Sequence, residues 1–147
     1  MYSNLLVPTD GSKLSDKALG QAIELAQALK ARITAFHASP DYPLPMYAEG
    51  VSVPLTSKKD YAAEAKAAAT KVLDRAAAKA AKAGVACTTV HVLAAAPWEA
   101  ILECAKKSKC DAIVMASHGR RGISAMLLGS ETTKVLTHSK LPVLVVR

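Results

Sequence analysis

Cysteine and long apolar runs are scarce in this chain of 147 residues. Its three cysteines include no Cys-x-x-Cys pair, so they indicate neither a disulfide framework nor a zinc site. No apolar run approaches the roughly 20 residues that cross a bilayer, and the start Met1-Tyr2-Ser3-Asn4 lacks the basic segment of a signal peptide. These absences predict a cytoplasmic protein without membrane partners.

Aromatic residues are also few, with one Phe, one Trp and four Tyr. The net charge of +7 is uneven: residues 1–75 carry nine basic and eight acidic side chains, and residues 76–147 carry ten and four. A basic half can attract nucleic acid or anionic ligands. Because neither an aromatic stacking platform nor a reading helix is recognisable, nucleic-acid binding is the weakest of the hypotheses.

The hydrophobic content of 51% is ordinary for a globular protein, and the length fits one domain over residues 1–147. Five short apolar runs, at residues 4–7, 33–37, 85–93, 112–116 and 143–146, alternate with four helical patterns. Four runs are nearly continuous in apolar residues, as in strands covered on both faces; the third alternates, which favours a place near an edge.

The helical patterns cover residues 12–30, 58–83, a segment that opens at Pro97 and includes Ala105, and 130–139. Ser12 or Ser15 can cap the first, Gly84 ends the second, and Pro97 suits the first position of the third. Strands alternating with helices predict a single α/β domain, a three-layer α/β/α sandwich around a twisted parallel sheet. Prolines exclude regular structure from residues 39–57, which are interpreted as a lid or as a surface loop.

In open parallel sheets, ligands bind beyond the carboxyl ends of the strands. The first apolar run is followed by Pro8-Thr9-Asp10, a glycine and a helix start. We expect Pro8 to end the strand pairing, while Asp10 could accept hydrogen bonds from ribose hydroxyls or hold a divalent cation. The alternative for Asp10 is a capping or turn residue.

The fourth apolar run leads into a second unusual segment. Gly119 and Gly129 are separated by nine residues, and a helix then opens at Ser130. Glycines allow close approach of the backbone, and Ser130 with the N–H groups of Glu131 and Thr132 can donate to phosphate oxygens. The pattern is neither a Walker loop nor a dinucleotide-binding Gly-x-Gly-x-x-Gly.

Taken together, these motifs resemble the universal stress protein family. The resemblance rests on Pro-Thr-Asp-Gly-Ser after the first run, His37 at the end of the second, Ser-His-Gly-Arg-Arg-Gly after the fourth, Leu-Leu-Gly-Ser, and the final Pro-Val-Leu-Val-Val. It covers the whole chain. It implies a five-stranded sheet in the order 3-2-1-4-5 with four main helices, and a homodimer paired through the last strand at Val143, Leu144 and Val145.

One branch of that family binds ATP through Gly-x2-Gly-x9-Gly-Ser/Thr. The resemblance implies adenosine contacts at Pro8, Thr9 and Asp10, with the backbone of Ala38 and Met115 beside the base. It implies phosphate contacts at Gly119, Gly129, Ser130 and Glu131, for ATP or for ADP or AMP, with Mg²⁺. The first motif position is Ala116 instead of glycine. Its methyl group costs little in an ordinary β conformation, but it would obstruct binding if φ must be positive there or if a phosphate packs against Cα.

Two arginines, Arg120 and Arg121, could clamp a phosphate through charge-assisted hydrogen bonds, or could form an exposed basic loop. His118 could act as a base or stay a neutral loop imidazole. No residue that orients an attacking water is visible, so at most slow ATP hydrolysis is expected. The main hypothesis is an ATP-binding stress-response sensor; the alternative is a dimeric interaction protein of the same family that binds no nucleotide.

Overall fold

The computed structural model describes residues 1–43, 56–120 and 128–147. Its strands are β1 (Asn4–Pro8), β2 (Arg32–Pro40), β3 (Cys87–Ala94), β4 (Ala112–Ala116) and β5 (Val143–Val146). Its helices are α1 (Lys13–Leu29), α2 (Lys58–Lys82), α3 (Pro97–Lys107) and α4 (Ser130–His138). All strand pairs are parallel, and the sheet order is β3-β2-β1-β4-β5, which confirms the predicted α/β fold and topology.

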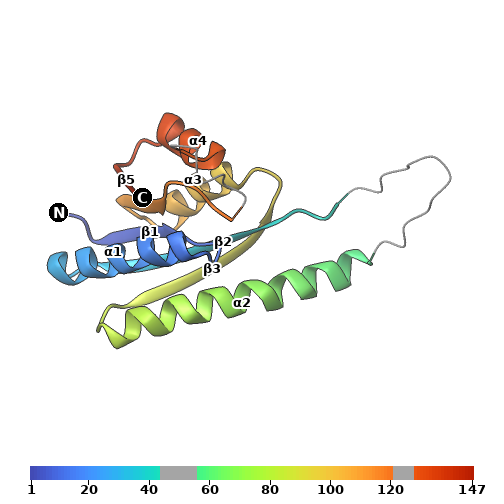
Figure 1. Cartoon of the computed structure of the whole chain (residues 1–147), viewed down its shortest axis with the longest axis horizontal. Helices are drawn as coiled ribbons and strands as arrows, with labels where there is room; N and C mark the ends of the chain where they lie inside the picture. Colours follow the sequence, from blue (N-terminus) through green and yellow to red (C-terminus); the bar gives the residue numbers. More distant parts are fainter. Residues whose placement is uncertain (44–55, 121–127) are drawn as a thin grey trace.

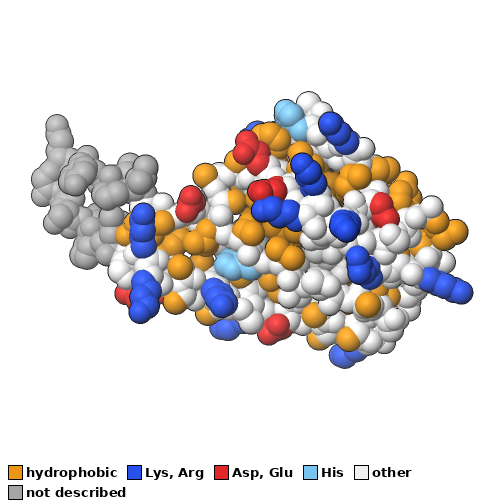
Figure 2. Space-filling view, turned by 180° about the vertical axis from the view of Figure 1, so that it is seen from behind, with side chains coloured by type: hydrophobic (Ala, Val, Ile, Leu, Met, Phe, Trp, Pro, Cys, Tyr) orange, Lys and Arg blue, Asp and Glu red, His pale blue; other side chains and the backbone are white. Residues whose placement is uncertain are grey.

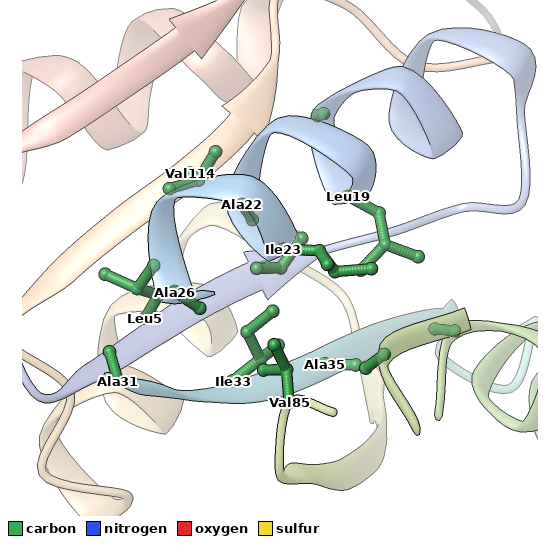
Figure 3. Packing of buried hydrophobic residues seen from close by; sticks show 14 of the residues in the cluster. Leu5, Leu19, Ala22, Ile23, Ala26, Ala31, Ile33, Ala35, Val85 and Val114 are labelled. Carbon is green, nitrogen blue, oxygen red and sulfur yellow. The ribbon is translucent and has the colours of Figure 1, made fainter. Parts of the chain in front are cut away.

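Helices cover both faces of the sheet, and Figure 1 shows α1 and α2 on one side and α3 and α4 on the other. The face under α1 and α2 holds the larger apolar cluster, in which Leu19 and Ile23 of α1 lie against strand residues such as Leu5 and Ile33 (Figure 3). The opposite cluster joins Phe36 and Ile113 to α3 and α4. Burial on both faces explains why the strands read as continuous apolar runs.

At the carboxyl ends of two strands, prolines lie inside the strand, where the sequence predicts an end or a loop. Pro8 was expected to end pairing, but it belongs to β1 and is in register with Phe36. The amide of Thr9 donates to the Phe36 carbonyl of β2. Because successive backbone N–H groups of a strand point to opposite sides, the nitrogen of Pro8 faces β4. On that side the strand register covers only Leu5 and Leu6, so Pro8 removes no ladder bond. β2 likewise extends to Pro40, although residues 39 and 40 were assigned to a loop.

The buried face of α2 is confined to part of the helix. Ala68 is exposed although it stands at helical spacing from Ala65 and Val72. The buried residues lie toward the second half of the helix: Ala69, Leu73, Ala76 and Ala80. The reason is visible in Figure 1, where the first turns of α2 extend past the body of the sheet, so that only its later turns pack on strands.

No helix among the described residues is long and apolar enough to cross a membrane. Lys and Arg side chains on the face shown in Figure 2 are scattered among acidic and hydrophobic ones instead of forming a stripe. That face therefore gives no support to the nucleic-acid hypothesis.

Candidate functional site

The candidate site lies between β1 and β4, at the point of the sheet where the strand order reverses. β1 is the middle strand, with β2 on one side and β4 on the other. The turn from β1 into α1 and the segment from β4 to α4 both begin at this switch point, where open α/β sheets place their ligands. The structure thus brings the two unusual sequence segments to one edge of the sheet.

The β1–α1 turn is held by its own polar side chains. Asp10 Oδ1 accepts from the amide of Ser12 at 2.9 Å, and the Ser12 hydroxyl caps α1 by accepting from the amide of Ser15 at 3.2 Å. The buried Thr9 hydroxyl lies 3.2 Å from that of Ser15 and accepts from the amide of Gly11. Asp10 therefore does act as a turn residue, as the alternative interpretation held.

Asp10 also contacts the segment that follows β4. Its second carboxylate oxygen accepts from the amide of Arg120 at 2.7 Å. A Cβ on Gly119 would lie 2.8 Å from the same oxygen, a distance that real Cβ atoms do not show. The guanidinium of Arg120 lies across Gly11, with Nη2 3.1 Å from where a Cβ would stand. Gly119 is thus required by the close approach of the two loops.

The carboxylate of Asp10 stays ionised at neutral pH. Its partial burial favours the neutral acid, but hydrogen bonds from Ser12, Arg120 and Ser15 outweigh burial and hold the pKa below its ordinary value of 3.8. A fixed negative charge therefore stands at the tip of β1. Such a charge suits ribose hydroxyls or a cation, and it repels a bare phosphate.

Gly129 closes the other side of the site. Its amide donates to the Ser117 carbonyl at 2.7 Å, and a Cβ would meet the Cα of His118 at 3.2 Å. The His118 ring is engaged locally, with Nδ1 3.2 Å from the Ser117 hydroxyl. This second close approach sets α4 directly behind the end of β4.

The start of α4 has no side-chain cap within the part of the chain described here, since its N-cap position is Gly129. Ser130 is exposed at the first helical position. The buried Thr132 hydroxyl turns inward instead and donates to the Ala116 carbonyl at 3.0 Å. Within the described ranges, no acceptor lies on the N–H groups of Ser130, Glu131 and Thr132, which stand at the positive end of the helix dipole.

The Glu131 side chain supports the start of α3. Its carboxylate accepts from the amide of Trp98 at 2.8 Å and lies 3.5 Å from the ammonium of Lys134. α3 has no cap of its own because its N-cap residue is Ala96. Because the carboxylate is engaged, the backbone N–H of Glu131 is the group that a phosphate could contact; that contact stays a prediction.

Ala116 ends β4 in ordinary extended pairing with Val146. It is not among the described non-glycine residues with positive φ, which are Lys30 and Lys109. Its side chain is buried in the apolar cluster under α1 and α2. The backbone conformation that would have made this alanine an obstacle is therefore not present.

The predicted site residues fall into three groups. Those that the structure brings together at the switch point are Pro8, Thr9, Asp10, Ala116, His118, Gly119, Arg120, Gly129, Ser130, Glu131 and Thr132. Ala38 and Met115 have their side chains on the α3–α4 face, so only their backbones are candidates for a base. Arg121 lies outside the described residues.

His37 contributes a contact that was not assigned from the sequence. Its Nδ1 lies 2.7 Å from the Thr9 carbonyl, directly before Asp10. His37 belongs to the motifs that carry the family resemblance, but sequence periodicity cannot show which loop its ring reaches. Among the described residues no three His, Cys, Asp or Glu side chains form a metal-binding group, so any cation at Asp10 would need oxygens from a ligand.

A parallel sheet in this order, covered by helices on both faces, is a doubly wound α/β fold. The universal stress protein family model matches residues 1–147, so the chain belongs to the universal stress protein family. The universal stress protein YxiE of Bacillus subtilis is 34% identical over 149 residues, covering 100% of both chains.

Solved structures of the family agree with the fold. A universal stress protein in complex with cAMP is 27% identical, with a TM-score of 0.71 over 99% of this chain and 97% of that one. The protein from Archaeoglobus fulgidus in complex with dAMP has a TM-score of 0.71 over 99% and 98%. The Arabidopsis thaliana protein with AMP bound has a TM-score of 0.67 over 97% and 90%. The last two are 19% identical and compare in fold alone.

Proposed function

We propose that this universal stress protein binds an adenine nucleotide at the switch-point edge, with ATP and Mg²⁺ as the expected ligands, and acts as a stress-response sensor. The observation that carries the proposal is the uncapped start of α4 beside the loop contact made by Gly119. Backbone donors at a helix start are a ready site for phosphate oxygens. The complex of the 27% identical relative with cAMP supports adenine as the base.

The charges at the site suggest how the ligand is oriented. The ionised Asp10 would repel phosphate, whereas the amide groups at Ser130 and Glu131 attract it. We therefore expect the ribose near Thr9 and Asp10 and the phosphates near α4, with the base beside the backbones of Ala38 and Met115. Mg²⁺ would be shared between Asp10 and phosphate oxygens, since this ion is held by few carboxylates and by its substrate.

The arrangement favours binding over catalysis. The polar side chains nearest the site are engaged in structural contacts: Asp10 accepts from two amides, and His118 Nδ1 lies 3.2 Å from the Ser117 hydroxyl. Efficient phosphoryl transfer needs an oriented water and stabilisation of the transferred group. We propose a protein that changes partner contacts when occupied, with at most slow hydrolysis. Its cytoplasmic location stays a prediction from the sequence.

Equilibrium titration tests this function. The purified chain would be titrated with ATP, ADP, AMP and cAMP, with and without Mg²⁺, in a calorimeter. We expect saturable binding, strengthened by Mg²⁺ for the nucleotides that carry more than one phosphate. Absence of saturable binding for all four, with the protein folded by circular dichroism, would overturn the proposal and leave a family member that binds no nucleotide.

A second candidate function, a dimeric interaction protein, is favoured by the last strand. β5 is an edge strand, Leu144 is 47% exposed, and Val143 and Val145 are only partly buried. An exposed apolar edge strand can pair with a copy of itself. Sedimentation of the Leu144→Pro variant should show monomer where the natural chain shows dimer. An intact dimer in that variant would count against this interface and leave nucleotide binding untouched.

A further inference from the structure

A polar row follows the apolar cluster under α2, toward the carboxyl ends of the strands. Ile33 and Ala35 of β2 point into that cluster, so alternation places His37 and Ser39 on the same face. Their register partners on β3 are His91 and Leu93. Two histidines thus stand side by side on neighbouring strands, on the face that α2 covers.

The two imidazoles are fixed by hydrogen bonds. The Thr9 carbonyl can only accept, so His37 carries a proton on Nδ1 and donates it over 2.7 Å. His91 Nε2 lies 2.9 Å from the Ser39 hydroxyl. The rings are stacked, with centroids 6.0 Å apart and planes 28° apart. Hydrogen bonds and stacking therefore hold the two rings beside each other.

The groups of the described residues that act on His91 are all basic. Burial lowers the pKa of His91 below its ordinary value of 6.5, and the nearby His37 and Lys66 lower that pKa further. His37 comes from β2 and Lys66 from α2, and no carboxylate of residues 1–43, 56–120 and 128–147 acts on the ring. Protonation of His91 would place its charge near a second imidazole and an ammonium.

We propose that the His37–His91 pair forms an acid-sensitive joint, at which acidification loosens the packing of α2 on β2 and β3. The inference does not rest on nucleotide binding. Because His91 binds its proton less readily in the packed state than in the open one, neutral His91 contributes fully to the packing above about pH 6.5. That contribution is lost as the pH falls through the lowered pKa, and opening becomes easier by up to about tenfold per pH unit.

Hydrogen exchange of the full chain tests the joint, at about pH 7.5 and about pH 5.5 with correction for the intrinsic rate. We expect the corrected opening of residues 66–73 and 87–94 to rise several-fold to tenfold at the lower pH, while residues 130–138 change little. The rise should vanish in His91→Gln and persist in His138→Gln, whose ring lies on α4. An equal rise with and without His91, or none in the natural chain, would overturn the proposal.

A surface variant gives a test that leaves the fold intact. Lys66 is exposed, and Lys66→Gln should move the NMR titration midpoint of His91 upward because one repelling charge is removed. Lys71→Gln is the matched control on the same helix, since Lys71 is exposed and is not among the charges that act on His91. Equal midpoints in the two variants would contradict the charge arrangement on which the joint depends.

Discussion

α1 and α4 both begin at the carboxyl ends of the strands, but their first turns are capped differently. The start of α1 is closed by its own side chains: Ser12 caps the helix, and Asp10 accepts from the Ser12 amide. The start of α4 has Gly129 at its N-cap and no capping side chain in the described structure. The comparison separates a self-supporting turn from a helix start whose first N–H groups have no partner among residues 1–43, 56–120 and 128–147.

The difference extends to the glycines that join these two regions. Gly119 lets the segment after β4 approach Asp10, and Gly129 lets α4 approach the end of β4. Both motif glycines are thus explained by contacts within this chain, before any ligand is considered. We infer that the two glycines shape the site, and that the N–H groups at the start of α4 bind the ligand.

The largest expected effect comes from breaking the contact between the regions. In Gly119→Ala the new methyl group would stand 2.8 Å from Asp10 Oδ2, so the carboxylate or one of the two loops must shift, against the hydrogen bonds that hold Asp10. We expect a loss of about 1–3 kcal/mol of unfolding free energy, measured in urea, and a loss of at least tenfold in nucleotide affinity. The control is Gly20→Ala, in the middle of α1, where only the end of the Lys79 side chain is near, at 3.6 Å.

A pair of serine variants tests the comparison itself. Ser12→Ala removes the α1 cap and should cost about 1 kcal/mol of stability, with nucleotide affinity nearly unchanged. Ser130→Ala removes no internal cap and should leave stability within about 0.5 kcal/mol, while weakening nucleotide binding several-fold. Reversed results, with stability lost at Ser130 and affinity lost at Ser12, would mean that the two starts had been assigned the wrong way round.

The pH dependence of stability reports on the closed turn. The pKa of Asp10 is lower in the folded chain than its ordinary 3.8, so its contribution is present above that pH and is lost as the pH falls through the folded value. Asp10→Asn should be less stable than the natural chain at neutral pH, and the gap should narrow in acid below about pH 3.8. A gap independent of pH would show that ionisation is not what stabilises the turn.

The smallest expected effect on binding belongs to Ala116→Gly, which restores the first motif glycine. Because Ala116 is extended and its methyl group lies in the core, glycine should change nucleotide affinity less than about threefold and cost about 1 kcal/mol of stability. Calorimetry and urea unfolding check the two numbers. A large gain in affinity would mean that the methyl group does obstruct the ligand.

Much of the fold followed from sequence because its signals are local. Continuous apolar runs, the Ser12 cap, Pro97 at a helix start and Gly84 past a helix end each gave an element or a boundary that the structure confirms. The errors arose where tertiary pairing decides. The strand membership of Pro8 depends on which neighbour its nitrogen faces, and no local pattern contains that information.

The sequence predicts the position of the candidate site better than it predicts the side-chain contacts within it. Parallel topology brings the residues after β1 and β4 together, so Asp10, Gly119 and Ser130 could be grouped in advance. The sequence did not indicate that the Glu131 carboxylate caps α3, or that His37 reaches the Thr9 carbonyl. Both contacts join segments far apart in the chain through side-chain directions that only the packed structure determines.

The most direct test of the central claim is to follow backbone amide signals by NMR while ATP with Mg²⁺, or AMP, is added. The account predicts saturable shifts at Ser130, Glu131 and Thr132 that exceed those at Lys13 and Leu14 in the first turn of α1. Shifts confined to the α1 start, or saturable binding that leaves the α4 amides unmoved, would contradict it.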